Sequence, residues 1–270
     1  MTTPELSRLS LNQITTDKYS LHEVVEACQA EGLGWIGAWR HKIEPVAASA
    51  KLIRDAGLRV SSLCRGGFFP AATAEERKLH IEDNLRAIDE AATLGTDLLV
   101  LVCGPAPDRD LVAARQMVVD GIGQIVDHAK KSGVRLGIEP LHPMYAAERS
   151  VVVTLQQAND MAEQFDTEAV GVVFDVYHVW WDPQVYVEIA RAGKRLCAFH
   201  VSDWLVPTQS LLMSRGMMGQ GVIEIRRLRA AVEAAGYMGP IEVEIFNEEV
   251  WKTAPREVIQ QMRESYLQVV

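Results

Sequence analysis

The chain has 270 residues, of which 48% are hydrophobic and 23% charged, and these proportions are those of an ordinary globular protein. Its 27 Lys and Arg residues against 36 Asp and Glu residues give a net charge of −9, which argues against a nucleic-acid partner because such proteins carry basic surfaces. No apolar run approaches the roughly 20 residues of a membrane span, so we expect no membrane association.

Cysteine usage and the first residues of the chain bear on its cellular compartment. The cysteines are far apart and show no CxxC spacing; they are Cys28, Cys64, Cys103 and Cys197. We interpret them as free buried thiols and not as a disulfide or zinc framework. The opening MTTPELSRLS lacks the basic and then apolar pattern of a signal peptide. These features predict a cytoplasmic protein.

A strand-like segment followed by a helix-like segment recurs eight times along the chain. The strand-like segments are short and apolar, at 9–15, 34–40, 58–64, 97–103, 135–140, 171–175, 196–202 and 240–246. The helix-like segments follow them, at 20–31, 43–56, 74–94, 110–131, 154–164, 184–192, 225–235 and 256–268. Ser20 is the expected N-cap of the first helix, ahead of Glu23.

This alternation predicts an α/β protein with a parallel sheet, and eight units predict a closed (β/α)8 TIM barrel that spans 1–270 as a single domain. An open nucleotide-binding sheet would need a GxGxxG motif after an early strand, and LNQITTDKYS and WRHKIEP contain none. In a TIM barrel the chemistry lies at the C-terminal ends of the strands.

Each of the last four strand-like segments delivers one residue of a metal-ligand type. These residues are Glu139, Asp175, His200 and Glu244. Three carboxylates at the mouth of one barrel would repel each other strongly without a cation between them. Three carboxylates and one imidazole suit a divalent cation of intermediate hardness, such as Mn²⁺, Mg²⁺ or Co²⁺. The alternative is that each carboxylate is capped or salt-bridged separately. We favour the metal site, because such residues end four successive strands.

Two neighbouring acidic residues receive different interpretations. Glu242 and Glu244 share one face of the last strand, and only Glu244 is near enough to its end to reach the mouth of the barrel. We expect Glu242 to be an inner-layer or bottom-face salt-bridge residue. Asp203, just past the seventh strand, is expected to orient His200 or to contact substrate, because a ligating imidazole usually donates its other N–H to such a group.

The order of motifs GIEP, DVYH, HVSD and EVEIF resembles the xylose isomerase-like superfamily, over the whole barrel and most specifically from 137 to 247. Within it, the chain resembles the sugar phosphate isomerase and epimerase branch, which includes keto-sugar 3-epimerases, inosose isomerases and dehydratases, and hydroxypyruvate isomerases. The resemblance implies that the four ligands bind one divalent metal, most often manganese. It also implies that Glu139 and Glu244 form the acid/base pair, one on each face of the substrate.

The same resemblance implies that His178 and Arg215 contact substrate oxygens. The loop of Arg215 departs from the family pattern, since it contains RGMMGQG where many members have RxxPGxG. Further candidates for substrate binding are Trp39, Arg65 and His142, each placed after a strand. We find no basic cluster typical of a phosphate pocket, and we expect an unphosphorylated substrate, with the pair Trp180–Trp181 favouring a bulky one such as a keto-glycoside.

The sequence therefore predicts a metal-dependent isomerase or epimerase acting on a keto-sugar or related polyhydroxy ketone through an enediolate. The main alternative is a lyase or dehydratase that eliminates a β-oxygen from a 3-keto-glycoside or inosose. An AP endonuclease fits less well, because of the net charge of −9 and the absence of histidine from the first four strands. A non-catalytic sugar or metal sensor is a further alternative, and the resemblance also allows a homo-oligomer.

Overall fold

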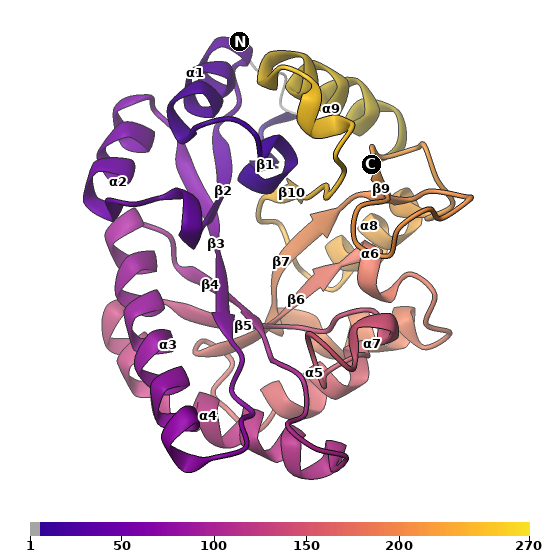
Figure 1. Ribbon diagram of the computed structural model, residues 1–270. Coiled ribbons are helices and arrows are strands. Elements are labelled where there is room, and N and C mark those ends of the chain that lie inside the picture. The colour runs from indigo at the N-terminus through magenta and orange to yellow at the C-terminus, as the bar shows by residue number, and fades with distance from the viewer. Residues whose placement is uncertain (1–5) are drawn as a thin grey trace.

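Eight parallel strands close into a barrel in the computed structural model, which describes residues 6–270 (Figure 1). Each strand pairs with the next in the chain, and the last pairs with the first. The strands are β1 (Leu9–Asn12), β2 (Trp35–Trp39), β3 (Arg59–Gly67), β4 (Leu98–Val102), β5 (Arg135–Glu139), β6 (Val170–Asp175), β7 (Leu196–Val201) and β10 (Ile241–Val243). The predicted TIM barrel is confirmed; the predicted features of residues 1–5 lie outside the described residues.

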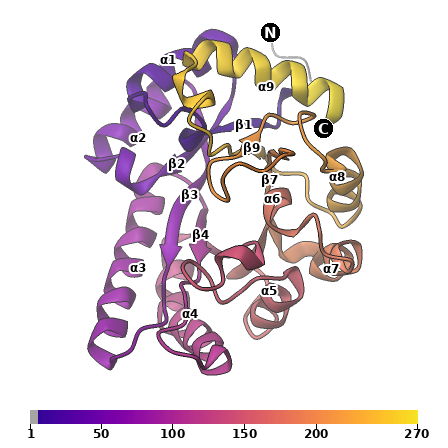
Figure 2. The same cartoon turned by 45° about the vertical axis from the view of Figure 1, so that its right-hand side comes forward.

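Helices surround the barrel at all eight predicted positions (Figure 2). They are α1 (Leu21–Glu31), α2 (Val46–Asp55), α3 (Ala74–Leu94), α4 (Leu111–Ser132), α5 (Leu155–Ala162), α7 (Val185–Ala192), α8 (Ile225–Ala234) and α9 (Pro255–Val269). Ser20 caps α1 as predicted, because its side chain accepts the Glu23 N–H while the Glu23 carboxylate accepts the Ser20 N–H.

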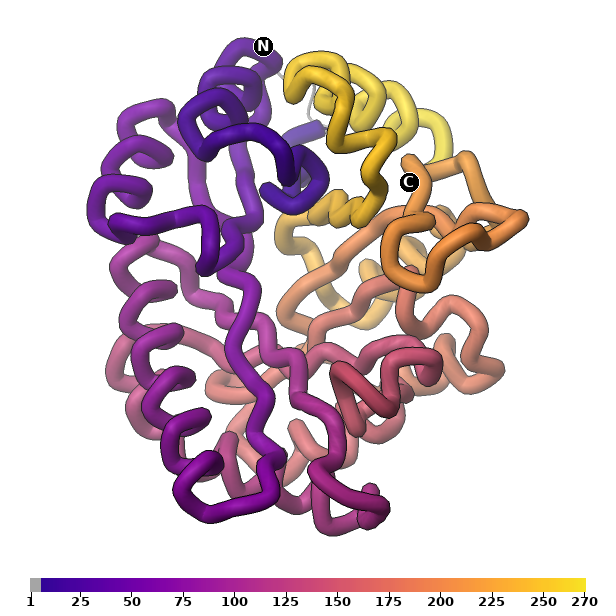
Figure 3. The backbone as a smooth tube through the Cα atoms, in the orientation of Figure 1, coloured from indigo at the N-terminus to yellow at the C-terminus, as the bar shows by residue number. Residues whose placement is uncertain are grey.

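The two ends of the chain meet where the barrel closes. Figure 3 shows the indigo helix α1 beside the yellow helix α9. Arg256 of α9 forms an ion pair with Glu31 of α1 at 2.8 Å, and Arg263 donates to the Glu31 carbonyl oxygen. This ion pair and this hydrogen bond therefore connect the first and the last β/α unit of the barrel.

The barrel interior contains a buried polar layer as well as apolar side chains. Glu242 occupies this layer, as the alternation predicts, and its carboxylate accepts hydrogen bonds from Asn12 at 2.6 Å and from Ser61 and Ser62. Gly37 on β2 makes room for it, because a Cβ there would lie 2.0 Å from Glu242 Oε1. Glu242 is thus held beneath the mouth of the barrel.

Some elements differ from the sequence-based expectation. Strand β10 extends only to Val243, although the Glu244 N–H still bonds to the Val201 carbonyl of β7, and the backbone pairing is lost at Ile245, whose N–H bonds to the Thr15 hydroxyl instead. The segment after β7, expected as a loop, forms a two-stranded antiparallel hairpin of β8 (Asp203–Trp204) and β9 (Arg215–Gly216). The sequence also gave no expectation of α6 (Val176–Val179) directly after β6, nor of the 3₁₀ turns at Gln13–Thr16, Arg40–Lys42, Pro143–Tyr145, Gly193–Arg195 and Val250–Lys252.

The four cysteines are free thiols, and Cys28, Cys64 and Cys103 are buried. None of the helices within residues 6–270 combines the length and hydropathy needed to cross a lipid bilayer.

Candidate metal centre and active site

Four ligand-type side chains meet at the mouth of the barrel. Glu139 and Asp175 end β5 and β6, His200 lies one residue before the end of β7, and Glu244 directly follows β10. All four side chains are buried, and one ligand atom from each lies within 4.8 Å of the others. The register of adjacent parallel strands brings them together, since Asp175 pairs with His200 across β6 and β7.

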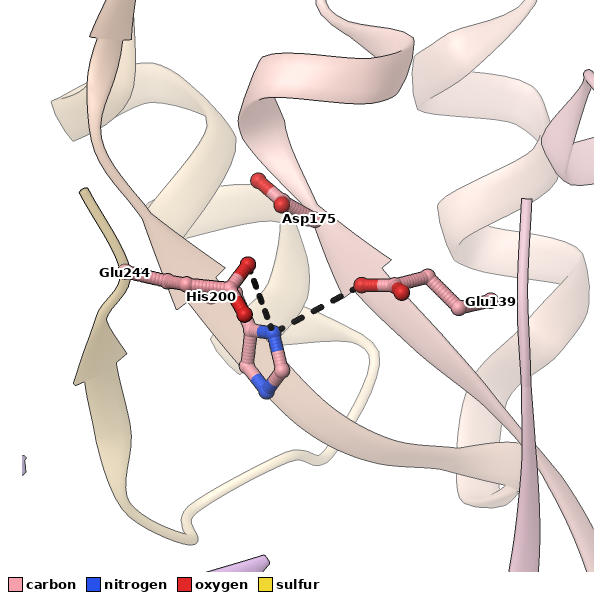
Figure 4. Close-up of side chains that lie close together, drawn as sticks. All are labelled: Glu139, Asp175, His200 and Glu244. Atoms are coloured by element: carbon pink, nitrogen blue, oxygen red, sulfur yellow. Dashed lines mark ion pairs between the residues drawn. The ribbon is translucent and has the colours of Figure 1, made fainter. Parts of the chain in front are cut away.

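The four side chains surround a common centre (Figure 4). His200 Nδ1 lies 3.6 Å from Glu139 Oε1 and 3.9 Å from Glu244 Oε2. Figure 4 shows Glu139 and Glu244 reaching toward this centre from opposite sides, with Asp175 between them. Two carboxylates therefore flank one small volume from opposite directions.

Several buried polar atoms of this cluster have no hydrogen-bond partner. They are Glu139 Oε1 and both ring nitrogens of His200. Buried polar atoms are normally paired, and two of these, Glu139 Oε1 and His200 Nδ1, face the common centre, which indicates a missing partner there. A cation among three carboxylates and an imidazole would be such a partner, and this donor set fits a divalent ion of intermediate hardness. The residues present therefore fit a bound metal.

Glu242 faces the far nitrogen of His200. Its Oε1 lies 3.8 Å from His200 Nε2, on the side away from the other three carboxylates. The sequence suggested that Asp203 orients His200 or contacts substrate, and in the structure it is Glu242 and not Asp203 that faces His200. Asp203 instead accepts the backbone N–H groups of Trp204, Gly219 and Ile223, because the hairpin after β7 turns its carboxylate into that loop.

Arg215 places a positive charge against the cluster. Its Nη1 donates to Asp175 Oδ2 at 2.9 Å and to Glu244 Oε2 at 3.0 Å, and its Nη2 lies 3.1 Å from His178 Nε2. The side chain is buried, and its guanidinium stacks over the Tyr177 ring at 4.5 Å. The β8–β9 hairpin, which the sequence did not predict, holds it there.

The ionisation of the cluster follows from burial and mutual charge. Burial raises the pKa of Glu244 to about 8, against the lowering effects of Arg215 and His200. Burial also opposes ionisation of Asp175, but the charge of Arg215, aided by the two histidines, holds its pKa below the ordinary value. For His200, burial is outweighed by the carboxylates of Glu242, Glu139 and Glu244, which raise its pKa to about 10.

His178 is positioned by a single turn of helix. Asp175 caps α6 by accepting the Tyr177 N–H at 2.8 Å, and His178 lies one turn later with its Nε2 3.6 Å from Asp175 Oδ2. Its Nδ1 accepts the backbone N–H of His142 at 3.2 Å. Burial lowers the pKa of His178 to about 3, so the imidazole is neutral at physiological pH.

A narrow cavity of about 30 Å³ lies over the cluster. Its walls are formed by Trp39, Cys64, Arg65, Val102, Glu139, Leu141, Tyr145, Arg149, His178, Leu212, Arg215, Glu244 and Phe246. Leu212 belongs to the loop between β8 and β9, and the Tyr145 hydroxyl donates to the neighbouring Leu211 carbonyl at 2.5 Å. A volume of this size admits about one water molecule.

Trp39 is fixed by hydrogen bonds at both of its N–H groups. Its indole N–H donates to Asn12 Oδ1 at 2.8 Å, and its backbone N–H donates to Gln13 Oε1 at 3.1 Å. Its ring meets the Phe246 ring edge-on at 5.7 Å. The indole therefore presents a rigid apolar wall to the cavity.

Other candidates from the sequence lie beside the cavity and do not line it. The His142 ring packs against Trp181 and Trp204, with centroids 5.6 and 5.0 Å away, and only its backbone N–H reaches His178. Trp180 and Trp181 line a different hollow near α7, so they give no support to a bulky substrate.

Sequence reasoning did not single out Arg149, Leu212 or Phe246 as site residues. Phe246 shares the strand face of Glu242 and Glu244, so period-two alternation was a usable signal for it. Arg149 and Leu212 belong to long loops, and no local pattern marks where such side chains point.

Comparison with known proteins agrees with the fold. Residues 16–267 match the xylose isomerase-like TIM barrel family. The solved structure of protein SMc04130 from Sinorhizobium meliloti 1021 is 47% identical, covers 98% of each chain and superimposes with a TM-score of 0.95.

Two relatives carry named activities. A 3-dehydroshikimate dehydratase from Pseudomonas putida is 28% identical over 240 residues, which are 85% of this chain and 36% of the relative. An inosose isomerase from Bacillus licheniformis is 26% identical over 156 residues, 56% of this chain and 54% of the relative. The matches thus span about a third and about a half of these relatives. From its barrel, its ligand motifs and the family match, the chain belongs to the xylose isomerase-like TIM barrel family.

Proposed function

We propose that this protein is a divalent-metal-dependent isomerase or epimerase of a keto-sugar or related polyhydroxy ketone. The observation that carries the proposal is the approach of two carboxylates, Glu139 and Glu244, to one buried centre from opposite sides. The inosose isomerase among the relatives supports it. We further propose that the protein acts in the cytoplasm on a small molecule.

Glu139, Asp175, His200 and Glu244 would hold the metal, for which Mn²⁺ is our first choice over Mg²⁺ and Co²⁺. When bound, the metal supplies Lewis-acid polarisation of a substrate carbonyl and stabilises the negative charge that develops on its oxygen. The unpaired Glu139 Oε1 and His200 Nδ1, which face each other at 3.6 Å, support this assignment.

The two glutamates move the proton. One takes a proton from the carbon next to the carbonyl, and the other delivers a proton from the opposite side. Delivery to the opposite face of the same carbon gives an epimer, and delivery to the neighbouring carbon gives the aldose or ketose isomer. Neutral His178 and the guanidinium of Arg215 line the same cavity, and they would bind substrate oxygens so that the reacting carbon lies between the two glutamates.

A second candidate is a dehydratase. The 3-dehydroshikimate dehydratase matches 85% of this chain, which favours a reaction in which a hydroxyl group leaves after the proton is taken. The same residues suffice, because one glutamate takes the carbon-bound proton and the other protonates the departing hydroxyl. The two reactions differ only in where the second proton goes.

Proton NMR in D₂O on metal-loaded protein tests the proposal. The substrates are fructose and its C3 epimer, hydroxypyruvate, an inosose, a 3-keto-glucoside and 3-dehydroshikimate. Deuterium next to a carbonyl, with every oxygen retained, supports the isomerase or epimerase. Loss of water or of an aglycone supports the lyase instead, and no metal-dependent exchange on any substrate rejects both.

Replacing each glutamate tests the acid/base assignment. We expect Glu139→Gln and Glu244→Gln to lower kcat/KM by about 10²- to 10⁴-fold at saturating metal, because each removes a proton-transfer group. Metal content is measured alongside to separate lost ligation from lost proton transfer. The control is Glu188→Gln, a buried carboxylate on α7 outside the site. Turnover that survives both substitutions would show that the assignment is wrong.

A further inference from the structure

Two arginines on the wall of the catalytic cavity lack a polar partner. Arg65 comes from β3 and Arg149 from the long segment between β5 and α5, and both line the cavity. Among the arginines within residues 6–270, these two alone are at least partly shielded from solvent and make no side-chain hydrogen bond or ion pair. Both side chains are partly buried, and no acidic side chain neutralises them, so their N–H groups are available to an anion that enters the cavity.

The surrounding acidic groups are already committed. Asp83 lines the adjoining hollow of about 270 Å³ together with Arg65. Its carboxylate bonds to Arg40 at 2.8 Å and to Arg86 at 2.9 Å. Arg215, which also lines the cavity, forms ion pairs with the carboxylates of Asp175 and Glu244. Glu139, the remaining acidic residue of the lining, is assigned to the metal in the proposed function, so no acidic side chain is left to pair with Arg65 or Arg149.

Aromatic rings hold the two guanidinium groups in place. The Arg65 guanidinium lies 4.1 Å over the Phe68 ring, and that of Arg149 lies 5.6 Å from the Tyr145 ring centre. Stacking of this kind fixes the plane of a guanidinium but uses none of its N–H groups. Burial lowers the pKa of Arg65, and the charge of Arg149 lowers it further, which is consistent with two neighbouring positive charges.

We infer that Arg65 and Arg149 together bind a carboxylate group of the substrate, so that this site acts on an acidic polyhydroxy ketone. The inference rests on the proposed function, since the ketone end of the substrate lies at the metal cluster. The fork of N–H donors on a guanidinium matches the two oxygens of a carboxylate, and charge-assisted bonds of this kind are about twice as strong as neutral ones.

The described lining of the cavity contains no lysine, and its third arginine, Arg215, is already bonded to Asp175 and Glu244. We therefore assign one carboxylate to Arg65 and Arg149, and competition with inorganic phosphate tests this choice. No local pattern in the sequence marks this pair, because Arg65 and Arg149 are distant in the chain and line the same cavity only in the folded barrel. The substrate we infer therefore has its ketone at one end of the cavity and its acid at the other.

A pair of probes isolates the carboxylate. Catechol and 3,4-dihydroxybenzoate present the same two adjacent hydroxyl groups, and only the second carries an acid. Titration calorimetry on Mn²⁺-loaded protein measures both dissociation constants. We expect 3,4-dihydroxybenzoate to bind at least about tenfold more tightly than catechol, because it gains charge-assisted bonds.

The variants test which residues create this preference. Arg65→Gln and Arg149→Gln are each expected to reduce the ratio of the two dissociation constants about tenfold, and Arg65→Lys is expected to retain part of it. Arg59→Gln is the matched control, because Arg59 is exposed, lies at the other end of β3 and stacks on Trp35 at 3.7 Å. It should leave the ratio unchanged. Thermal melts verify that each variant is folded.

Several outcomes would overturn the inference. Equal affinity for the two probes would do so, as would a preference that survives both arginine-to-glutamine substitutions. Displacement of 3,4-dihydroxybenzoate by inorganic phosphate at lower concentration than by acetate would replace the carboxylate with a phosphate. If the preference holds but no ketone exchanges deuterium, the proposed function fails, and with it the acidic ketone as substrate, while Arg65 and Arg149 remain a carboxylate-binding pair. If neutral ketones exchange as fast as acidic ones, the proposed function stands and this inference fails.

Discussion

His200 is the residue on which the charge balance of the site depends. Its Nδ1 faces Glu139 and Glu244, whereas its Nε2 faces Glu242 at 3.8 Å. If His200 held a metal, its imidazole would have to be neutral, and Glu242 would be a partner for the other ring nitrogen of the type that orients ligating histidines. Asn12, Ser61 and Ser62 fix Glu242 in turn, so the orientation of one imidazole depends on three neighbouring strands.

Metal binding should therefore release protons. In the metal-free protein, carboxylates raise the pKa of His200 to about 10, and burial raises that of Glu244 to about 8, so both groups hold a proton at pH 7. A metal competes with these protons, and its affinity should rise about ten- to hundredfold per pH unit between pH 6 and 8. Calorimetry in buffers of different ionisation enthalpy counts the protons released.

The variant Glu242→Gln provides the comparison for this measurement. It removes the carboxylate that contributes most to the raised pKa of His200. Fewer protons should then be released on metal binding, and the affinity should fall through the loss of the orienting group. Identical proton release in the parent and the variant would contradict this account.

At the scale of elements, the hairpin after β7 decides where Arg215 lies. Asp203 holds the base of this loop by accepting three backbone N–H groups, at 2.9 Å from Trp204, 2.9 Å from Gly219 and 3.0 Å from Ile223. The Arg215 carbonyl in turn accepts the side-chain N–H of Asn247. A buried carboxylate thus connects the two ends of a loop whose middle closes the cavity.

Asp203→Ala should loosen this loop and not the barrel. The buried N–H of Ile223 and the partly buried N–H groups of Trp204 and Gly219 would lose their acceptor, and the buried one alone costs about 1–3 kcal/mol. We expect faster hydrogen exchange across 203–223 and a drop in kcat/KM of tenfold or more through misplacement of Arg215. Asp182→Ala is the control, since Asp182 accepts the Gln184 N–H in a loop outside the site. Unchanged exchange across 203–223 would count against a role for Asp203 in holding the loop.

At the scale of the whole molecule, the four proposed ligands come from four adjacent strands. A bound metal would therefore cross-link half of the barrel. We propose that the barrel is a single domain that unfolds in one transition. Metal at 100 times its dissociation constant should then add about 2.7 kcal/mol to the free energy of unfolding. Calorimetric melts with and without Mn²⁺ measure the shift. Asp175→Asn should remove most of this metal-dependent shift. A second unfolding transition whose midpoint does not change with Mn²⁺ would contradict a single domain.

The sequence and the structure agree best where one strand or helix decides the outcome by itself. The eight strands and the flanking helices follow from apolar runs, helical periodicity and caps such as Ser20. Residues at strand ends, such as Glu139 and Asp175, could also be identified from the sequence, because the C-terminal end of each strand in a TIM-type β/α barrel lies at the mouth. Agreement fails for loops, as the position of Asp203 shows, since its partners lie up to 20 residues away.

The sequence by itself determined the barrel, the four ligand-type residues and the family, because each depends on the order and periodicity of residues along single strands. Only the tertiary structure decided that Glu242 faces His200, that Arg215 lies on the carboxylates and that Arg65 and Arg149 share one cavity wall. Each of these pairs joins different elements of the chain. Whether their side chains meet depends on strand register and loop path, which no local pattern specifies.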